Sequence, residues 1–135
     1  MLNSLIAAAL LASSPAGGVQ VDVGRANWKA LPTLKAAPRP LPTSAMVEHV
    51  ENLLSSGDCR LAGQTPSRFD FTVPYAALVE PNGTLRQVVV GETGCAKLET
   101  FVGLVVLRMA EEGDFSRTGE PKARWYSSEI NFNLQ

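Results

Sequence analysis

The stretch that decides the fold is "VEPNGTLRQVVVGETGC", residues 79–95. Its Asn82-Gly83 pair separates two apolar runs, and this dipeptide is the strongest short-range signal for a β-hairpin. The connection that it favours is a type I′ turn, which needs positive φ at both positions. The stretch therefore predicts two antiparallel strands joined at this pair, with Thr93 and Gly94 ending the second strand.

The strands of the hairpin extend outward, and a third strand follows near the end of the chain. Residues 68–80 alternate between apolar and other side chains, which predicts a half-buried strand, and residues 85–90 form its partner. Pro74 has no amide hydrogen, so its nitrogen should face an edge or a bulge. Residues 124–134 alternate in the same way, and they predict the last strand.

Two amphipathic helices complete the pattern. Apolar residues recur with helical spacing over residues 46–54, with Thr43 or Ser44 as the N-cap and Gly57 at the end. A second helix is predicted from its apolar face over residues 98–109. The order helix, strand, strand, helix, strand predicts an α+β fold, with two helices packed on a three-stranded, largely antiparallel sheet.

The first residues of the chain favour export. The run "LIAAALLA", residues 5–12, is apolar, too short for a membrane-spanning helix, and followed by small residues. This pattern predicts a cleaved signal peptide over residues 1–16, and a buried N-terminal helix is the alternative.

A Pro-rich linker is predicted between the signal peptide and the folded domain, over residues 17–42. Four prolines within residues 32–42 favour a semi-extended spacer over a helix or a central strand. Residues 17–24 alternate valines and could form a short accessory strand. The folded domain is assigned to residues 43–135.

Composition and motifs argue against several classes of function. A formal net charge of −1 gives no basic surface for nucleic acid. His49 is the only histidine, and the chain has no G-x-S-x-G motif, so no metal site, cofactor site or catalytic residue is predicted. Glu111, Glu112 and Asp114 indicate a solvated acidic helix end, with contact to a cation or a basic partner as the alternative.

Cys59 and Cys95 are the only cysteines. In an oxidising compartment an isolated pair most simply forms one disulfide bond. Two unrelated buried thiols are the alternative, because a free cysteine often behaves as a small core residue.

Six short motifs follow one another in a fixed order in the second half of the chain. They are Asn82-Gly83, Thr93-Gly94, Leu98-Glu99, Phe115-Ser116, Gly119-Glu120-Pro121 and the alternating Ile130, Phe132 and Leu134. In this order, residues 69–134 resemble the C-terminal domain of TonB-type energy transducers. Placed on that pattern, a bond between Cys59 and Cys95 would join the end of the first helix to the start of the second, and we predict this disulfide.

The resemblance implies a function for the last strand. In the family, this strand is a sheet edge that accepts an extended segment of an outer-membrane transporter. The resemblance therefore implies a periplasmic protein-binding module without enzymatic activity, whose partner is such a transporter or another envelope protein, with the membrane involved only indirectly. The expected partner-binding residues are Arg124, Trp125, Tyr126, Ser127, Ser128, Glu129, Ile130 and Asn131.

A second function is compatible with the same fold. The chain could be a stand-alone structural envelope protein that forms a homodimer through the same edge, without a role in transport.

Overall fold

The computed structural model describes residues 19–25, 27–36, 42–57, 59 and 69–134. The predicted signal peptide, residues 1–16, lies outside the described residues. Within the described ranges, no helix has the length and apolar character needed to cross a membrane. The elements are β1 (Gln20–Gly24), the short 3-10 helix η2 (Trp28–Ala30), α2 (Ser44–Ser55), β2 (Phe69–Val79), β3 (Leu85–Gly91), α3 (Ala96–Glu111) and β4 (Arg124–Leu134).

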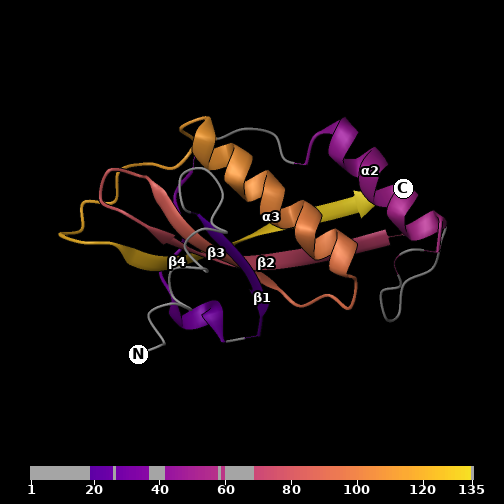
Figure 1. Ribbon diagram of the computed structural model, residues 1–135, viewed down its shortest axis with the longest axis horizontal. Coiled ribbons are helices and arrows are strands. Elements are labelled where there is room, and N and C mark those ends of the chain that lie inside the picture. The colour runs from indigo at the N-terminus through magenta and orange to yellow at the C-terminus, as the bar shows by residue number, and fades with distance from the viewer. Residues whose placement is uncertain (1–18, 26, 37–41, 58, 60–68, 135) are drawn as a thin grey trace, which may run out of the picture.

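The predicted α+β fold is confirmed, with a sheet that is larger than expected. The strand order is β1-β3-β2-β4, and β2 pairs antiparallel with both β3 and β4. The fourth strand is β1, which pairs parallel with β3 and makes the sheet mixed. Its residues belong to the segment expected as a linker, and the valine alternation there is the accessory strand that the sequence allowed. Both helices lie over one face of the sheet, hereafter the front face (Figure 1).

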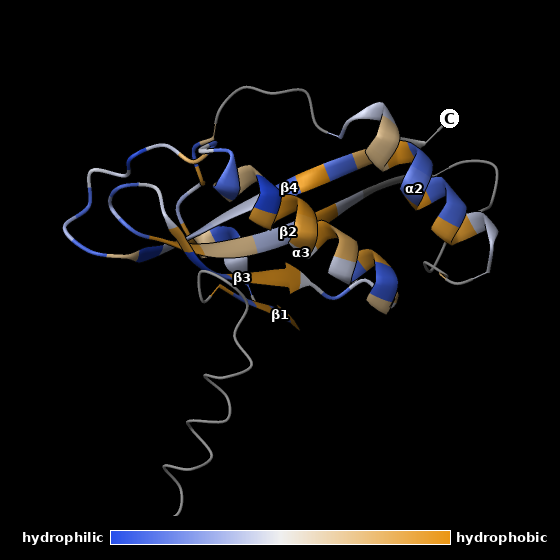
Figure 2. Ribbon diagram, turned by 45° about the horizontal axis from the view of Figure 1, so that its top comes forward, coloured by the Kyte–Doolittle hydropathy of each residue, from blue (hydrophilic) through white to orange (hydrophobic). Residues whose placement is uncertain are grey.

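The core lies between the front face and the two helices. Alternate residues of each strand point toward the helices, as the period of two requires, and the helices present apolar stripes to them (Figure 2). α3 contacts β3, whereas α2 contacts β4. The fully buried side chains that fill this space include Val50, Val73, Tyr75, Val79, Val88, Val90, Leu98, Val102, Val106 and Phe132.

The hairpin forms where it was predicted, but with a different turn. Among the described residues only glycines have positive φ, so Asn82 does not, and a type I′ turn is excluded. The amide of Gly83 donates to the carbonyl of Glu80 at 2.8 Å, which places Pro81 and Asn82 in the two central positions. Proline has a fixed φ near −65°, which suits the first central position of a type I turn. Gly83 follows in the left-handed region with φ 94°, as in three-residue hairpin loops.

Pro74 lies where it costs the sheet no hydrogen bond. The paired register between β2 and β3 begins one residue later, at Tyr75 opposite Val90. A Cβ atom on Gly91 would lie 2.8 Å from Cγ of Pro74, so the glycine allows the two chains to approach at this point. The sequence predicts that the proline nitrogen faces an edge or a bulge, and in the structure Pro74 lies just beyond the paired register of β2 and β3.

The chain between β1 and α2 connects the two edges of the sheet. Residues 27–36, hereafter the strap, run from the end of β1 to the outer edge of β4 by way of η2. Thr33 forms a parallel bridge with Ser127 of β4, and Ala36 forms an antiparallel bridge with Phe115. One continuous N-terminal segment thus supplies the strand beside β3 and the short pairing beside β4.

Candidate functional site: the outer edge of β4

The hydrogen bonds of Ser127 show which residues of β4 direct their backbone N–H and C=O groups toward the outer edge of the sheet. Its amide donates to the carbonyl of Pro32 at 3.0 Å, and its carbonyl accepts from the amide of Leu34 at 2.9 Å. Both groups therefore point away from β2. Because backbone direction alternates along an antiparallel strand, Trp125, Glu129 and Asn131 also direct their polar backbone groups outward.

This alternation of backbone direction separates the eight expected partner-binding residues into those that face the outer edge and those that face β2. Tyr126, Ser128 and Ile130 direct their backbone groups toward β2, and they stand opposite Ala77, Tyr75 and Val73 in the register. The side chains of Tyr126 and Ile130 are buried against the helices. A partner strand on the outer edge would not meet the backbone groups of these three residues.

The buried Tyr75 contacts Ser128 through a side-chain hydrogen bond. Burial raises the pKa of Tyr75 above its ordinary value, and the hydrogen bond to Ser128 opposes this effect. Ser128 therefore stabilises the packing between β2 and β4 and belongs to the inner side of the strand.

The side chains of the first residues of β4 contact other parts of the chain. Nη1 of Arg124 lies 3.3 Å from Oε2 of Glu120, in an exposed ion pair. Trp125 is half-buried opposite Leu78, on the face of the sheet away from the helices, hereafter the back face. Ser127 is paired with the strap. The outward backbone groups of Trp125 lie before the pairing at Ser127, beside the exposed ion pair, and those of Glu129 and Asn131 follow it without interruption toward the end of the strand.

Glu129 and Asn131 form the open part of the edge. Both side chains are exposed, and within the described ranges no hydrogen bond reaches the outward amide or carbonyl of either residue. Thr72 of β2 donates a side-chain hydrogen bond to Oδ1 of Asn131, which fixes this amide on the back face. The two outward backbone positions are therefore free to pair with another extended chain.

The strap stops short of this open part for a local reason. After Leu34 it turns toward the loop that follows α3, where the amide of Ser116 donates to the carbonyl of Lys35 at 3.2 Å. Its next residue, Ala36, bridges to Phe115. The chain that began to pair with β4 at Ser127 is thus drawn away, although β4 itself continues to Leu134.

A hollow of about 660 Å³ lies on the back face beside the open edge. The strap supplies one wall of this hollow, and β2 and β4 supply the other. In η2, the side chain of Asn27 accepts a hydrogen bond from the amide of Lys29, which stabilises this turn of the wall. The side chains that line the hollow include Trp28, Lys29 and Thr33 from the strap, with Thr72, Pro74 and Glu129 from the sheet.

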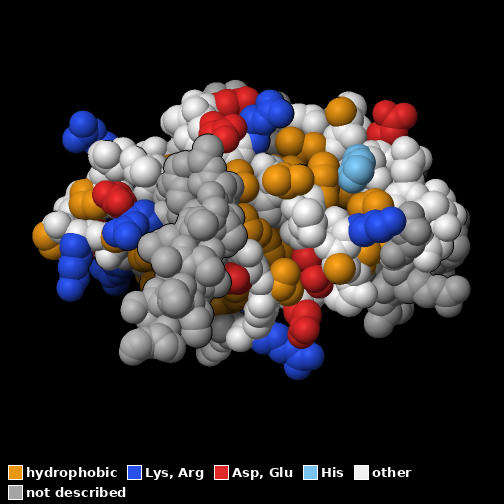
Figure 3. Space-filling model, viewed as in Figure 1, with side chains coloured by type: hydrophobic (Ala, Val, Ile, Leu, Met, Phe, Trp, Pro, Cys, Tyr) orange, Lys and Arg blue, Asp and Glu red, His pale blue; other side chains and the backbone are white. Residues whose placement is uncertain are grey.

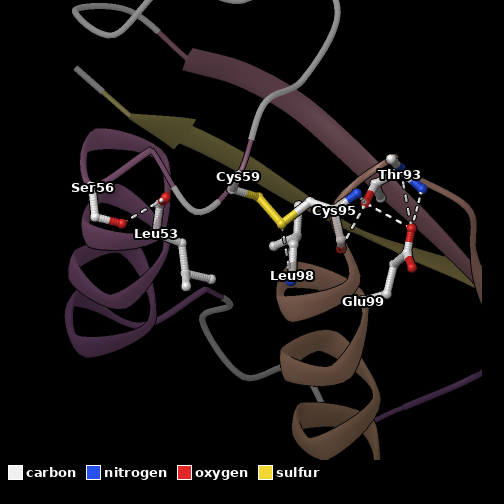
Figure 4. The surroundings of a disulfide bond; sticks show 8 residues. Leu53, Ser56, Cys59, Thr93, Cys95, Leu98 and Glu99 are labelled. Carbon is white, nitrogen blue, oxygen red and sulfur yellow. Dashed lines mark hydrogen bonds between the residues drawn. A yellow bond between two sulfur atoms is a disulfide. The ribbon is translucent and has the colours of Figure 1, made fainter.

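The predicted disulfide between Cys59 and Cys95 is confirmed. The two Cα atoms lie 5.2 Å apart, and both residues are 3% exposed. Cys59 follows α2, and Cys95 is the N-cap of α3, so the bond joins the end of one helix to the start of the other (Figure 4). The Sγ atom of Cys95 also accepts a hydrogen bond from the amide of Leu98 at 3.4 Å.

Two of the recurring motifs meet at the start of α3. The carboxylate of Glu99, 7% exposed, accepts hydrogen bonds from the amide and the hydroxyl of Thr93 and from the amide of Gly94 (Figure 4). The Thr93-Gly94 and Leu98-Glu99 motifs therefore form one network that holds the loop between β3 and α3. This position gives both motifs a structural role.

The other titratable residues singled out in the sequence form no metal cluster in the part of the chain that the structure describes. His49 stacks on Phe101 with ring centroids 4.4 Å apart. The acidic residues after α3 do not act together: Glu112 lies 3.9 Å from Arg108, whereas Asp114 is buried.

Apolar side chains gather on the outer surface of the helix layer. This surface includes a hollow of about 540 Å³ between α2 and α3, lined in part by Met46, Phe101 and the 57% exposed Leu104 (Figure 3). It is continuous with a second hollow beside His49, since both share Phe101 and Leu104.

Sequence reasoning missed the strap as part of the site. Trp28 and Thr33 lie in the segment assigned as a linker, and their positions depend on pairing with residues about a hundred positions away. The one signal in the sequence was Trp28, because a large aromatic residue is not needed in a solvated spacer.

The chain matches no family model, no curated protein and no solved structure.

Proposed function

We propose that this protein is a protein-binding module that adds an extended segment of a partner protein to the outer edge of β4. The observation that carries this proposal is that the edge already pairs with a short segment of the chain itself, through one parallel bridge at Ser127. The pairing ends at Leu34, while the backbone groups of Glu129 and Asn131 stay open within the described ranges. An open strand edge is a template for a further strand, and its affinity comes from main-chain hydrogen bonds.

The resemblance to the C-terminal domain of TonB-type transducers supports the same use of the last strand. Under this proposal, the protein works in the periplasm after cleavage of a signal peptide over residues 1–16, and its partner is an outer-membrane transporter or another envelope protein. The disulfide is in keeping with an oxidising compartment. The binding mode relies on main-chain hydrogen bonds and needs no reacting group, so the proposal includes neither a cofactor nor an enzymatic activity.

The edge is tested by a matched pair of variants at Glu129. Glu129→Pro removes the outward amide hydrogen without removing a bond to β2, because this nitrogen faces away from the sheet. Glu129→Ala removes the same side chain and keeps the amide. We expect proline to abolish partner binding and alanine to preserve it, with both variants folded by circular dichroism.

Binding is measured by photo-crosslinking in cells that produce the protein. A benzoylphenylalanine at Asn131 reports on the open edge, and one at the exposed Glu111 of α3 serves as the control position. We expect a crosslink to an envelope protein from position 131 alone, lost in the Glu129→Pro background. A folded Glu129→Pro variant with an undiminished crosslink would refute strand addition. A crosslink only to a second copy of the chain would replace the proposal with self-association through the same edge.

A further inference from the structure

We propose that the hollow between the strap and the back face of the sheet is a side-chain pocket of this edge, and that it takes a large apolar side chain, preferably aromatic, from the added strand. This inference rests on the proposed function, because it requires an extended segment paired with β4. It adds a preference for one residue of that segment.

The position of the hollow follows from strand geometry. The side chains of Thr72, Pro74 and Glu129 all lie on the back face, where Pro74 stands opposite Glu129 in the register. A strand added to β4 would lie about 4.8 Å from it, and its residue opposite Glu129 would project toward the same face. That side chain would enter the space beside Trp28.

The chemistry of the lining favours an apolar guest. The largest lining groups are the half-buried indole of Trp28 and the ring of Pro74. The uncharged polar residues of the lining are Asn27, Thr33, Thr72, Ser127 and Ser128. The two charged residues, Lys29 and Glu129, have opposite signs, so a charged guest would be attracted by one and repelled by the other, and the lining favours neither sign. An aromatic ring would gain contact with the indole and the proline ring.

The strap holds Trp28 in place from both sides. Before it, the side chain of Asn27 accepts from the amide of Lys29 at 3.3 Å. After it, the amide of Leu31 donates to the carbonyl of Trp28, and Thr33 is bridged to Ser127. The wall of the hollow is therefore formed before a partner binds, which lowers the entropic cost of binding.

The test uses blocked nonapeptides of alternating threonine and valine, whose central residue is phenylalanine, serine, lysine or aspartate. They are titrated into the 15N-labelled, disulfide-bonded protein, and binding is followed by NMR. The amides of Glu129 and Asn131 report on the edge, and the indole N–H of Trp28 reports on the hollow, with Trp125→Phe used to assign it. We expect the phenylalanine peptide to bind about tenfold more tightly than the serine, lysine and aspartate peptides.

Two variants separate the hollow from the edge. Trp28→Ala removes the largest wall, and Thr72→Trp fills the hollow from an exposed position on β2. We expect either one to abolish the preference for phenylalanine while the amides of Glu129 and Asn131 still shift. Because the two variants act in opposite ways, a folding defect in one leaves the other as the test.

The possible results distinguish the two proposals. Peptides that shift both edge amides with no dependence on the central residue would overturn the pocket and leave strand addition standing. Peptides that shift neither the edge amides nor the Trp28 indole would overturn both. A preference for phenylalanine that survives Glu129→Pro unchanged would overturn strand addition, because the hollow would then bind without the edge.

Discussion

Reduction of the disulfide between Cys59 and Cys95 should lower the free energy of unfolding by about 4 kcal/mol. The bond closes a loop with a sequence separation of 36 residues, and the chain-entropy account gives roughly this value for a loop of that length. Reduction leaves both sulfur atoms in place, so it creates no cavity at these buried positions. The loss should therefore come mainly from the greater freedom of the unfolded chain.

The assay is urea unfolding followed by circular dichroism, with and without a reducing agent. We expect the midpoint to fall on reduction and the slope to rise, because an uncrosslinked unfolded chain exposes more surface. A difference below about 1 kcal/mol would refute the loop-closure reasoning, since it would mean that the reduced unfolded chain is already constrained.

A pair of double variants separates the crosslink from the helix cap. Cys95 is the N-cap of α3 and accepts from the amide of Leu98. Cys59→Ala with Cys95→Ser keeps an acceptor at this position, whereas Cys59→Ala with Cys95→Ala removes it. We expect the alanine pair to be less stable by about 1 kcal/mol, the usual value of an N-cap.

Three further predictions concern the rest of the fold. Gly83→Ala should lower the free energy of unfolding by about 3 kcal/mol, and Gly57→Ala by only about 1 kcal/mol, as measured by urea unfolding. Both glycines have positive φ, but a Cβ atom at Gly83 would also lie 2.6 Å from the carbonyl oxygen of Phe115, whereas one at Gly57 would meet no atom of the described residues. Equal losses would contradict this. Glu99→Ala should lower the free energy of unfolding by about 2–3 kcal/mol, and Glu99→Gln by clearly less, because glutamine keeps an oxygen that can accept the three hydrogen bonds. Equal losses in the two variants would show that these hydrogen bonds do not stabilise the fold. Burial raises the pKa of Tyr75, so the native state keeps its proton at a pH where the unfolded chain loses it. The contribution of Tyr75 to stability should therefore be constant below about pH 10 and fall above it. This fall should be shallower in Tyr75→Phe, and an identical alkaline profile would refute the assignment.

The sequence was sufficient for the elements whose pattern is local. The helical spacing around Val50 and Val102 and the alternation through Val73 and Ile130 each record one buried face, and the structure has those helices and strands. The predicted type I′ turn was wrong, because the fixed φ of Pro81 favours a different turn, in which Asn82 keeps a negative φ.

The open edge could be predicted only in part. The alternation of β4 separates inward from outward side chains, but it does not show which backbone groups are already paired. That depends on Thr33 and Leu34, which lie in a Pro-rich segment without periodicity and contact β4 across a long stretch of sequence. The hollow beside Trp28 has the same origin, so neither feature has a local signal.

The placement of the N-terminal segment at both sheet edges bears on how the protein folds. Gln20 of β1 pairs with Gln87, and Thr33 of the strap pairs with Ser127, which are separations of 67 and 94 residues (87 − 20 and 127 − 33). During synthesis, these early residues leave the ribosome long before their partners do, so β1 waits for β3, and Thr33 waits until nearly the whole chain is available. The hairpin and α3 are local and can form sooner. The strap, although it is made early, therefore pairs with the sheet last, because its partner strand β4 is made last.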